Sequence, residues 1–343
     1  MYLRVLENEV RNARPSLGRK AQFEESYLEI RMFNVGHGEC ILIIFDGDRV
    51  WLIDSGSNSI TRNRVLGENL INYLEQHSIT LETIVASHPH FDHAGAFETI
   101  LGSNSSQISA TLSIYRSEDP TWHSTRGWKE RFRAAIEARQ NRGDTVNEIA
   151  LRNGYREVHI ADDVTAHLFA GSGEGPYTSI FLQIRYRDAK LMFTGDAHCR
   201  YEVDLLDDFG DVQFRADVVK VTHHGSSSGT ATRVINAIKP GIAIASTGDD
   251  SGHRLERDTL DRLGGHSGLP GPGACDVRSV FETIIDGDII LRTDGRPYIG
   301  GLLYQVGFNP PGQFANDLGA ELKSVDDVDS ERTSGDYPAC RLE

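Results

Sequence analysis

Apolar and polar residues alternate along several short stretches of the chain, which is the pattern of half-buried β-strands. In YLEIRMF, which starts at Tyr27, apolar side chains at Leu28, Ile30 and Met32 alternate with charged ones and predict a first strand. ECILIIF and RVWLID flank turn-forming residues at 46–48 and predict a hairpin. The stretch SIFLQIRYRDAKLMFTGD predicts a second hairpin.

Other segments repeat apolar residues at the three-to-four-residue spacing of an amphipathic helix. These segments are GENLINYLEQH, GWKERFRAAIEARQ and LERDTLDRLG. Short apolar runs such as TIVAS, DVVKVT and GIAIAS lie among them and predict further strands. The mixture of many strands with helices favours a layered α/β architecture.

The chain has 343 residues, which is long enough to bury a sizeable core. We expect one catalytic domain over residues 27–306, preceded by a polar lead-in at residues 1–26. Residues 307–343 are rich in Pro, Gly, Ser and Asp and have little apolar periodicity. An acidic, flexible tail is therefore expected there.

The charge of the chain argues against a dedicated nucleic-acid-binding module. There are 35 Lys and Arg residues against 50 Asp and Glu, which gives a formal net charge of -15. Such a surface repels nucleic acid unless metal ions or a local basic patch intervene.

The cellular compartment is predicted from three further features. No apolar stretch approaches the ~20 residues that a membrane span requires, and the N-terminal residues do not resemble a cleavable signal. The cysteines show no paired spacing and are expected to be reduced thiols. They are Cys40, Cys199, Cys275 and Cys340. We therefore expect a cytoplasmic protein with no membrane partner.

The densest cluster of chemically active residues is SHPHFDHAG at 87–95. Alternate side chains of an extended segment share a face, so His88 and His90 can bind one ion together. Asp92 and His93 follow where the backbone turns, and they are expected to point toward a neighbouring position. A second ion can bind there.

A dinuclear site also needs a bridging carboxylate and a histidine from another segment, with ions ~3.5 to 4 Å apart. Asp196 ends LMFTGD, and His223 and His224 end DVVKVTHH, each after an apolar strand. A lone histidine is more often an exposed or hydrogen-bonded residue than a ligand. The ordered combination of HxHxDH, TGD and HHGS favours a metal site over ordinary surface loops.

These motifs resemble those of the metallo-β-lactamase superfamily. FNVGHGECILI, LIDSGS, FTGDA and VVKVTHHGSSS are similar to the hydrolase domain of the competence protein ComEC and its free-standing soluble relatives. The resemblance covers roughly residues 28–305. It implies an α/β fold of the αββα type, a sandwich of two mixed sheets flanked by helices, with the site at one edge between the sheets.

The resemblance also implies roles for the ligands. His88 and His90 would hold the first ion, and Asp92 and His93 the second. Asp196 would bridge the two ions.

Further roles follow from the same resemblance. One residue of the pair His223 and His224 would ligate the second ion while the other meets the substrate, and we take His223 as the ligand. His253 in SGHR matches a position where a histidine faces the substrate. Asp92, His224 and His253 are thus the expected catalytic residues, and Asp54 would support the ligand loop by hydrogen bonding.

Several positions depart from the pattern of these relatives. VGHGE replaces VGQGD, and His37 and Glu39 could be functional or simply part of a structural turn. PYTS stands where relatives carry NNxS, so substrate contacts could differ. A third histidine for the first ion is not evident from the spacing. The candidates are His123, His159 and His167.

The expected activity is that of a dinuclear metal-dependent hydrolase acting through metal-bound hydroxide, most readily a phosphodiesterase or nuclease. The substrate would be a nucleic acid or a nucleotide. A lactonase or thioesterase on the same site is the first alternative, and a non-catalytic interaction scaffold is the second. The ligand types suit zinc first and manganese next.

A basic segment offers a nucleic-acid contact. Arg131 and Arg133 lie on the helix predicted from Trp128, and Trp122 and Trp128 could stack on bases. A solvated amphipathic helix is the competing interpretation. Lys220, with His224 and His253, would add to the electrostatic stabilisation of a phosphate.

Overall fold

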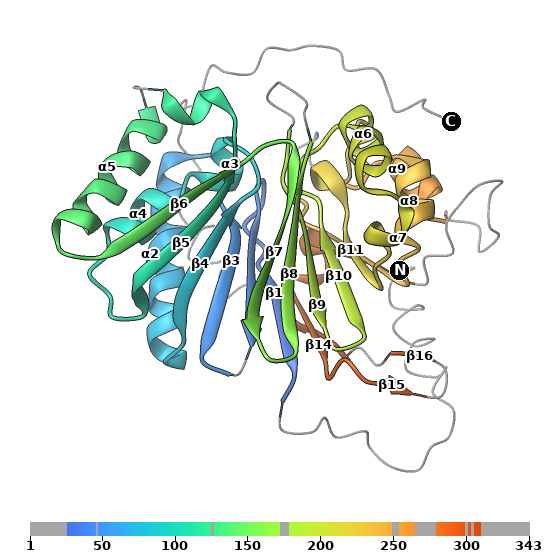
Figure 1. Cartoon of the computed structure of the whole chain (residues 1–343), viewed down its shortest axis with the longest axis horizontal. Coiled ribbons are helices and arrows are strands. Elements are labelled where there is room, and N and C mark those ends of the chain that lie inside the picture. The colour runs from blue at the N-terminus through green and yellow to red at the C-terminus, as the bar shows by residue number, and fades with distance from the viewer. Residues whose placement is uncertain are drawn as a thin grey trace.

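Two β-sheets, packed face to face, form the centre of the computed structural model (Figure 1). The structure describes residues 26–45, 47–124, 127–171, 178–248, 254–264, 279–298, 301–302 and 305–309. Within these residues, no helix has the length and apolar composition that a bilayer span would need.

The first sheet has eight strands in the order β17-β14-β1-β2-β3-β4-β5-β6. It is antiparallel from β17 to β3 and parallel from β3 to β6. The predicted first strand and hairpin are confirmed as β1 and the antiparallel pair β2 and β3. The strands are β1 (Leu28–Met32), β2 (Cys40–Phe45), β3 (Arg49–Ser55), β4 (Thr80–Ala86), β5 (Ile108–Ser117), β6 (Thr145–Leu151), β14 (Asp288–Thr293) and β17 (Gln305–Asn309).

The second sheet has seven strands in the order β13-β12-β11-β10-β9-β8-β7. It is antiparallel from β7 to β10 and parallel from β10 to β13. The second predicted hairpin is confirmed as β9 and β10. The strands are β7 (Gly154–Ala161), β8 (Val164–Ala170), β9 (Phe181–Tyr186), β10 (Ala189–Phe193), β11 (Val218–Lys220), β12 (Ile242–Ala245) and β13 (Ser279–Glu282). A small pair, β15 (Pro297–Tyr298) and β16 (Gly301–Leu302), lies apart from both sheets.

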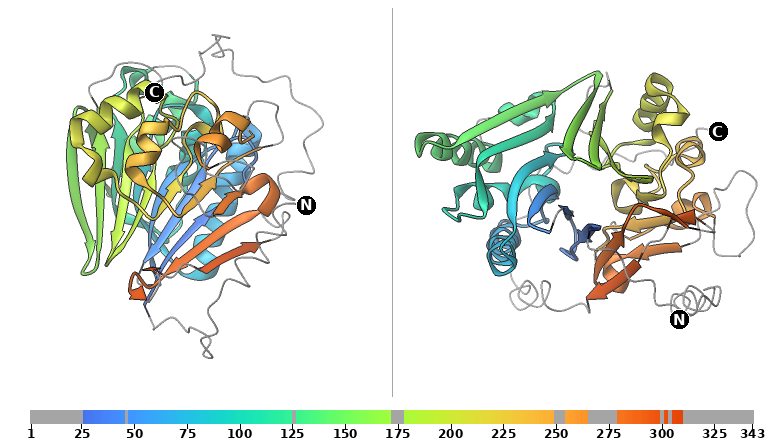
Figure 2. Two further views of the ribbon diagram at one scale, coloured as in Figure 1. Left: turned by 90° about the vertical axis from the view of Figure 1, so that its right-hand side faces the viewer. Right: turned by 60° about the horizontal axis from the view of Figure 1, so that its bottom comes forward.

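Helices cover the outer faces of both sheets (Figure 2). The first sheet carries α2 (Ile60–His77), α4 (Phe97–Gly102) and α5 (Gly127–Asn141), with α3 (Phe91–Ala94) and the 3-10 turn η1 (Pro120–His123). The second sheet carries α6 (Cys199–Phe209), α7 (Asp211–Phe214), α8 (Thr232–Ile238) and α9 (Arg257–Arg262). The remaining short elements are η2 (Thr222–Gly225) and α10 (Thr283–Asp286). The predicted αββα sandwich is confirmed.

Three apolar layers follow from the alternation along the strands. Ile41, Ile43 and Trp51 point into the core between the sheets, because burial of alternate residues directs one face of each strand inward. Their neighbours Leu42 and Leu52 face α2 and α4 on the other side. A third layer lies between the second sheet and α6 and α8.

The predicted ends of the domain fall largely on residues outside those described. Of the expected lead-in at 1–26, only Ser26 is described. Of the expected tail at 307–343, residues 307–309 are described, and they belong to β17, which pairs with β14. The sheet therefore extends three residues past the boundary expected at 306.

The basic segment forms α5, but its aromatic residues are not exposed. Trp122 and Trp128 are 2 % and 6 % exposed and pack against Phe132 in the outer core. Arg131 is paired with Glu98 at 2.7 Å. The idea that these tryptophans stack on bases is therefore wrong, and the structure favours the amphipathic-helix interpretation.

One expectation about the cysteines is also wrong. Cys199, the first residue of α6, is disulfide-bonded. Cys40 is a buried free thiol, as expected. Cys275 and Cys340 lie outside the described residues.

Candidate metal centre

The predicted ligands come from loops that follow strands at one edge of the sandwich. β4 ends just before His88, β10 ends three residues before Asp196, and β11 ends three residues before His223. Carboxyl ends of parallel strands meet at one edge of a sheet, which is where α/β proteins place their sites. This edge is the one that carries α3, at the top of Figure 1.

The HxHxDH segment brings its histidine rings close together. The rings of His88 and His90 lie 4.4 Å apart, so the alternate histidines share a face. The backbone then turns into α3, which carries Asp92 and His93. The His93 ring lies 4.3 Å from that of His88. The His88 ring therefore lies close to the rings of both other histidines of the segment.

A second group of ligand atoms converges beside them. Asp196 Oδ2 lies 3.0 Å from His93 Nε2 and 3.2 Å from His224 Nε2. Asp92 Oδ2 lies 3.7 Å from the same nitrogen of His224. Glu39, His93, Asp196 and His224 each offer a ligand atom within 4.8 Å of one another. Four buried side chains thus supply nitrogen and oxygen donors to one point.

The donor set fits divalent cations. Two histidine nitrogens lie 3.2 Å apart between carboxylates, an arrangement in which a shared cation satisfies all the groups. His88 Nε2 and Asp196 Oδ1 are buried, and neither has a hydrogen-bond partner among the described residues. Buried polar atoms nearly always have a partner. A metal ion bound to these two atoms would supply it.

Asp54 orients the ligand loop, as the resemblance implied. Its Oδ2 accepts hydrogen bonds from His93 Nδ1 at 2.8 Å and from the Ser87 hydroxyl at 2.7 Å. Its Oδ1 accepts the Ser87 N–H at 2.7 Å. Hydrogen bonding of this kind fixes the ring orientation of a ligand histidine. Asp54 itself has a φ of 50°, a conformation that is uncommon outside glycine.

His224, and not His223, points into the cluster. The His224 side chain is 1 % exposed, and its Nδ1 donates to Ser246 O at 2.9 Å, which directs Nε2 at the carboxylates. His223 Nε2 is 3.9 Å from Asp196 Oδ2, and its side chain is 24 % exposed. The geometry favours the opposite assignment to the one expected from the sequence.

Charge within the cluster shifts the pKa values strongly. Burial alone would raise the pKa of Asp196, but His224 and His93 hold it well below its usual range. Burial would lower the pKa of His224, but Asp196 raises it to about 9. Burial lowers the pKa of His223 to about 4, so this residue is neutral at pH 7. Metal binding requires neutral imidazole, so loading the site would release the His224 proton.

The VGHGE turn takes part in the site. His37 is 6 % exposed, and its Nε2 lies 3.1 Å from Asp92 Oδ2. Glu39 is fully buried and forms an ion pair with Lys220. Lys220 Nζ donates to Gly195 O at 3.0 Å and lies 3.5 Å from Asp196 Oδ1.

Lys220 cannot contact a substrate, because it is fully buried. The electrostatic contribution expected from the sequence stays a prediction, and it would have to act without direct contact. The ammonium group acts on the site through the charge of Asp196 instead.

None of the candidates for a third histidine is joined to the cluster by a contact among the described residues. The His159 side chain is 80 % exposed, and His167 bonds Tyr155 and Thr165 on β7 and β8. A histidine not considered from the sequence lies closer. His198 stacks on His223 with ring centroids 5.5 Å apart. Its position two residues after Asp196, in TGDAH, was the available signal.

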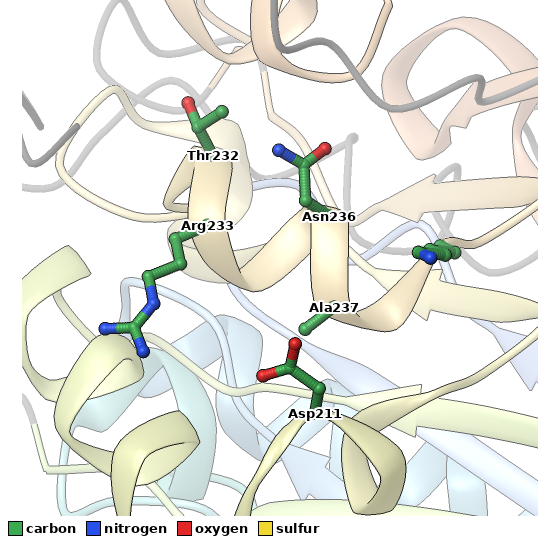
Figure 3. Close-up of a pocket in the computed structure, with 6 residues that line it drawn as sticks. Asp211, Thr232, Arg233, Asn236 and Ala237 are labelled. Carbon is green, nitrogen blue, oxygen red and sulfur yellow. The ribbon is translucent and has the colours of Figure 1, made fainter.

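His253, predicted to be catalytic, lies outside the described residues. The first two residues of PYTS lie outside them as well. A surface pocket on α7 and α8 is separate from the cluster (Figure 3). It is lined by Asp211, Thr232, Arg233, Asn236, Ala237 and Lys239.

The fold and the site define a metallo-β-lactamase-type protein. The family model described as "Metallo-beta-lactamase superfamily" matches residues 34–249, and the chain belongs to that superfamily. Its members are mostly metal-dependent hydrolases and generally bind divalent metals.

Two curated proteins are similar in sequence. Recombination protein 2 of Haemophilus influenzae is 24 % identical over 228 residues, which cover 66 % of this chain and 25 % of that protein. ComE operon protein 3 of Bacillus subtilis is 25 % identical over 256 residues, covering 70 % of this chain and 31 % of that protein. The chain thus spans between a quarter and a third of the length of these relatives.

Two of the solved structures that match are more distant in sequence. YhfI from Bacillus subtilis, a metallo-beta-lactamase fold protein, has a TM-score of 0.44 and 16 % identity, covering 74 % of this chain and 96 % of that chain. The short form of human tRNase Z has a TM-score of 0.41 and 13 % identity, covering 68 % and 97 %.

Proposed function

We propose that the protein is a dinuclear metal-dependent hydrolase that cleaves phosphodiester bonds in a nucleic acid or nucleotide. The observation that carries this proposal is the convergence of Asp92, His93, Asp196 and His224 beside His88 and His90. Scaffold proteins have no need of such a buried set of charged donors, whose desolvation is costly without a cation.

The ligands divide into two groups. We assign His88 and His90 to the first ion and Asp92, His93 and His224 to the second. Asp196 would serve both ions, because its Oδ2 meets the second group while its buried Oδ1 has no hydrogen-bond partner among the described residues. We assign His198 as a further donor for the first ion, since its ring lies beside that of His223 and it follows Asp196 by two residues.

When bound, two divalent ions would supply a hydroxide nucleophile at neutral pH and would neutralise charge on a phosphoryl group. Neighbouring residues of the protein hold the ligand side chains in position. His37 holds Asp92 through Nε2, and Asp54 holds His93 through Nδ1. His223 is neutral and partly exposed, so its ring N–H can donate a hydrogen bond to a phosphoryl oxygen.

The preference for phosphodiesters has two supports. One relative is named for recombination, which is a process of DNA. Two neighbouring cations also favour a negatively charged phosphodiester over an uncharged lactone or thioester. The net charge of -15 repels long polyanions at a distance, so attraction must arise close to the ions.

A substrate panel tests the proposal. The zinc- or manganese-loaded protein is assayed on bis-p-nitrophenyl phosphate, single-stranded DNA, RNA, cyclic nucleotides, a lactone and a thioester. We expect diester hydrolysis that Asp196→Asn abolishes. Hydrolysis of the lactone or thioester alone would replace the proposal with that activity, and no hydrolysis by a fully loaded protein would support a scaffold.

A further inference from the structure

A buried glutamate lies outside the ligand cluster but next to it in the chain. Glu202 is fully buried in α6, the helix that begins three residues after Asp196. Its Oε1 accepts the Thr222 hydroxyl and the Thr230 N–H at 3.0 Å, and its Oε2 accepts the Ala231 N–H at 2.7 Å. One carboxylate thus satisfies three donors from the segment 222–231.

The segment that Glu202 holds carries the histidine pair. Thr222 precedes His223 directly, and Thr230 and Ala231 lie where the segment enters α8. Glu202 therefore bonds both ends of the loop and leaves its middle directed at the cluster.

The backbone of this loop is unusual and requires external support. His223, His224 and Thr230 have φ values of 52°, 53° and 59°, in the left-handed region that side-chain-bearing residues rarely adopt. Such conformations persist only where surrounding contacts enforce them. The left-handed turn at His224 is also what directs its Nδ1 at Ser246 O and its Nε2 at Asp196.

A second buried contact joins this loop to the segment between β10 and Asp196. The Thr222 hydroxyl lies 3.0 Å from the Thr194 hydroxyl, which donates to Lys220 O at 2.8 Å. Thr194 is two residues before Asp196, and Thr222 is two residues before His224. On the other side of the loop, Arg262 donates to Ser227 O at 3.1 Å and to Gly229 O at 3.0 Å.

From these contacts we infer that Glu202, acting through Thr222, is a positioning residue that sets the His224 imidazole against Asp196 for binding of the second ion. The inference rests on the proposed function, because it assigns a role at that same centre. Residues that orient ligands in this way typically contribute about 10–100-fold to metal affinity.

Three variants and one control test this role. Thr222→Val removes the hydroxyl with little change of shape, while Thr222→Ser keeps it. Glu202→Gln replaces one acceptor oxygen by an NH2 donor, which faces either the donors at Thr222 and Thr230 or the Ala231 N–H. Asp204→Asn changes an exposed carboxylate on the same helix and serves as the control.

Zinc is titrated into metal-stripped protein, and calorimetry measures the binding. The melting temperature is measured with and without zinc. We expect Glu202→Gln and Thr222→Val to weaken one of two zinc-binding events about 10–100-fold. Thr222→Ser should retain more affinity than Thr222→Val, and Asp204→Asn should match the wild type. The rise in melting temperature on adding zinc should shrink in the two impaired variants.

The outcomes separate the inference from the proposed function. Wild-type zinc affinity in both Glu202→Gln and Thr222→Val would overturn the inference alone. An equal drop in melting temperature with and without zinc, at unchanged affinity, would also overturn it, since the contacts would then serve only the fold. If Glu202→Gln does not fold, the comparison of Thr222→Val with Thr222→Ser decides. A wild-type protein that binds no zinc or manganese would overturn both.

Discussion

The Nε2 atoms of His93 and His224 lie 3.2 Å apart, although the two residues are separated by 131 positions in the chain. Each nitrogen is also close to Asp196 Oδ2. Two protonated imidazoles would repel each other at this distance, and a shared divalent cation would turn the repulsion into coordination. An ion bound between these two nitrogens would join the two halves of the sandwich.

Asp196 should be the least replaceable ligand. In Asp196→Ala the two cations would face each other without a shared carboxylate, so their mutual repulsion would increase. We expect a loss of turnover greater than the about 10–100-fold typical of residues that only orient ligands. Metal content by elemental analysis and turnover of bis-p-nitrophenyl phosphate check this. Two bound ions with near-normal turnover in the variant would refute the bridging role.

The two adjacent histidines should separate binding from catalysis. His224→Ala removes a buried nitrogen of the cluster, and we expect at least about tenfold weaker binding of one ion. His223→Ala should keep both ions and lower kcat, because His223 is the partly exposed member of the pair. Calorimetry and steady-state kinetics on the same preparations distinguish the roles. The reverse pattern would restore the assignment expected from the sequence.

His198 should contribute to the first ion. We expect His198→Ala to weaken the binding of one ion while the other remains at wild-type affinity. His159→Ala is the matched control, since the His159 side chain is 80 % exposed on β7. Zinc titration of both variants provides the measurement. Identical affinities in the two variants would show that His198 is not a ligand.

Much of the fold follows from local pattern, and the ligand roles follow only in part. Strand alternation places Leu28, Ile30 and Met32 in the core between the sheets, as predicted. Sequence could not decide between His223 and His224, because the choice depends on two consecutive left-handed residues whose cost is met by distant contacts. The sequence also could not predict the buried ion pair of Lys220 with Glu39, because that contact joins the VGHGE turn to β11.

The burial of the aromatic residues likewise could not be predicted from the local sequence pattern. An amphipathic helix shows which residues share a face, but the neighbouring elements determine which face is covered. Trp122 and Trp128 pack on Phe132 because α5 lies against the first sheet. The hypothesis that these tryptophans stack on bases required their side chains to face solvent.

Glu282 should make stability depend on pH. Burial raises the pKa of Glu282 from 4.5 to about 7 in the folded protein. The folded state then binds a proton that the unfolded state releases, so the contribution is favourable below pH 4.5 and is lost as pH rises through 7. Glu282→Gln should therefore stabilise the protein above pH 7 and have little effect below pH 4.5.

Urea denaturation of wild type and Glu282→Gln across this pH range tests that expectation. Glu137→Gln, at an exposed position on α5, is the control, and its stability difference from the wild type should not change with pH in this way. A stability difference that is constant with pH would contradict the pKa shift.

The most direct test of the dinuclear centre is metal content measured together with thermal stability before and after chelation. The account predicts two divalent ions per chain, a fall in melting temperature when a chelator removes them, and recovery of stability and diester hydrolysis on adding zinc or manganese, because ligands from both halves of the sandwich are joined by the ions. A protein that carries no metal after zinc or manganese loading, or whose melting temperature and activity do not change on chelation, would contradict it.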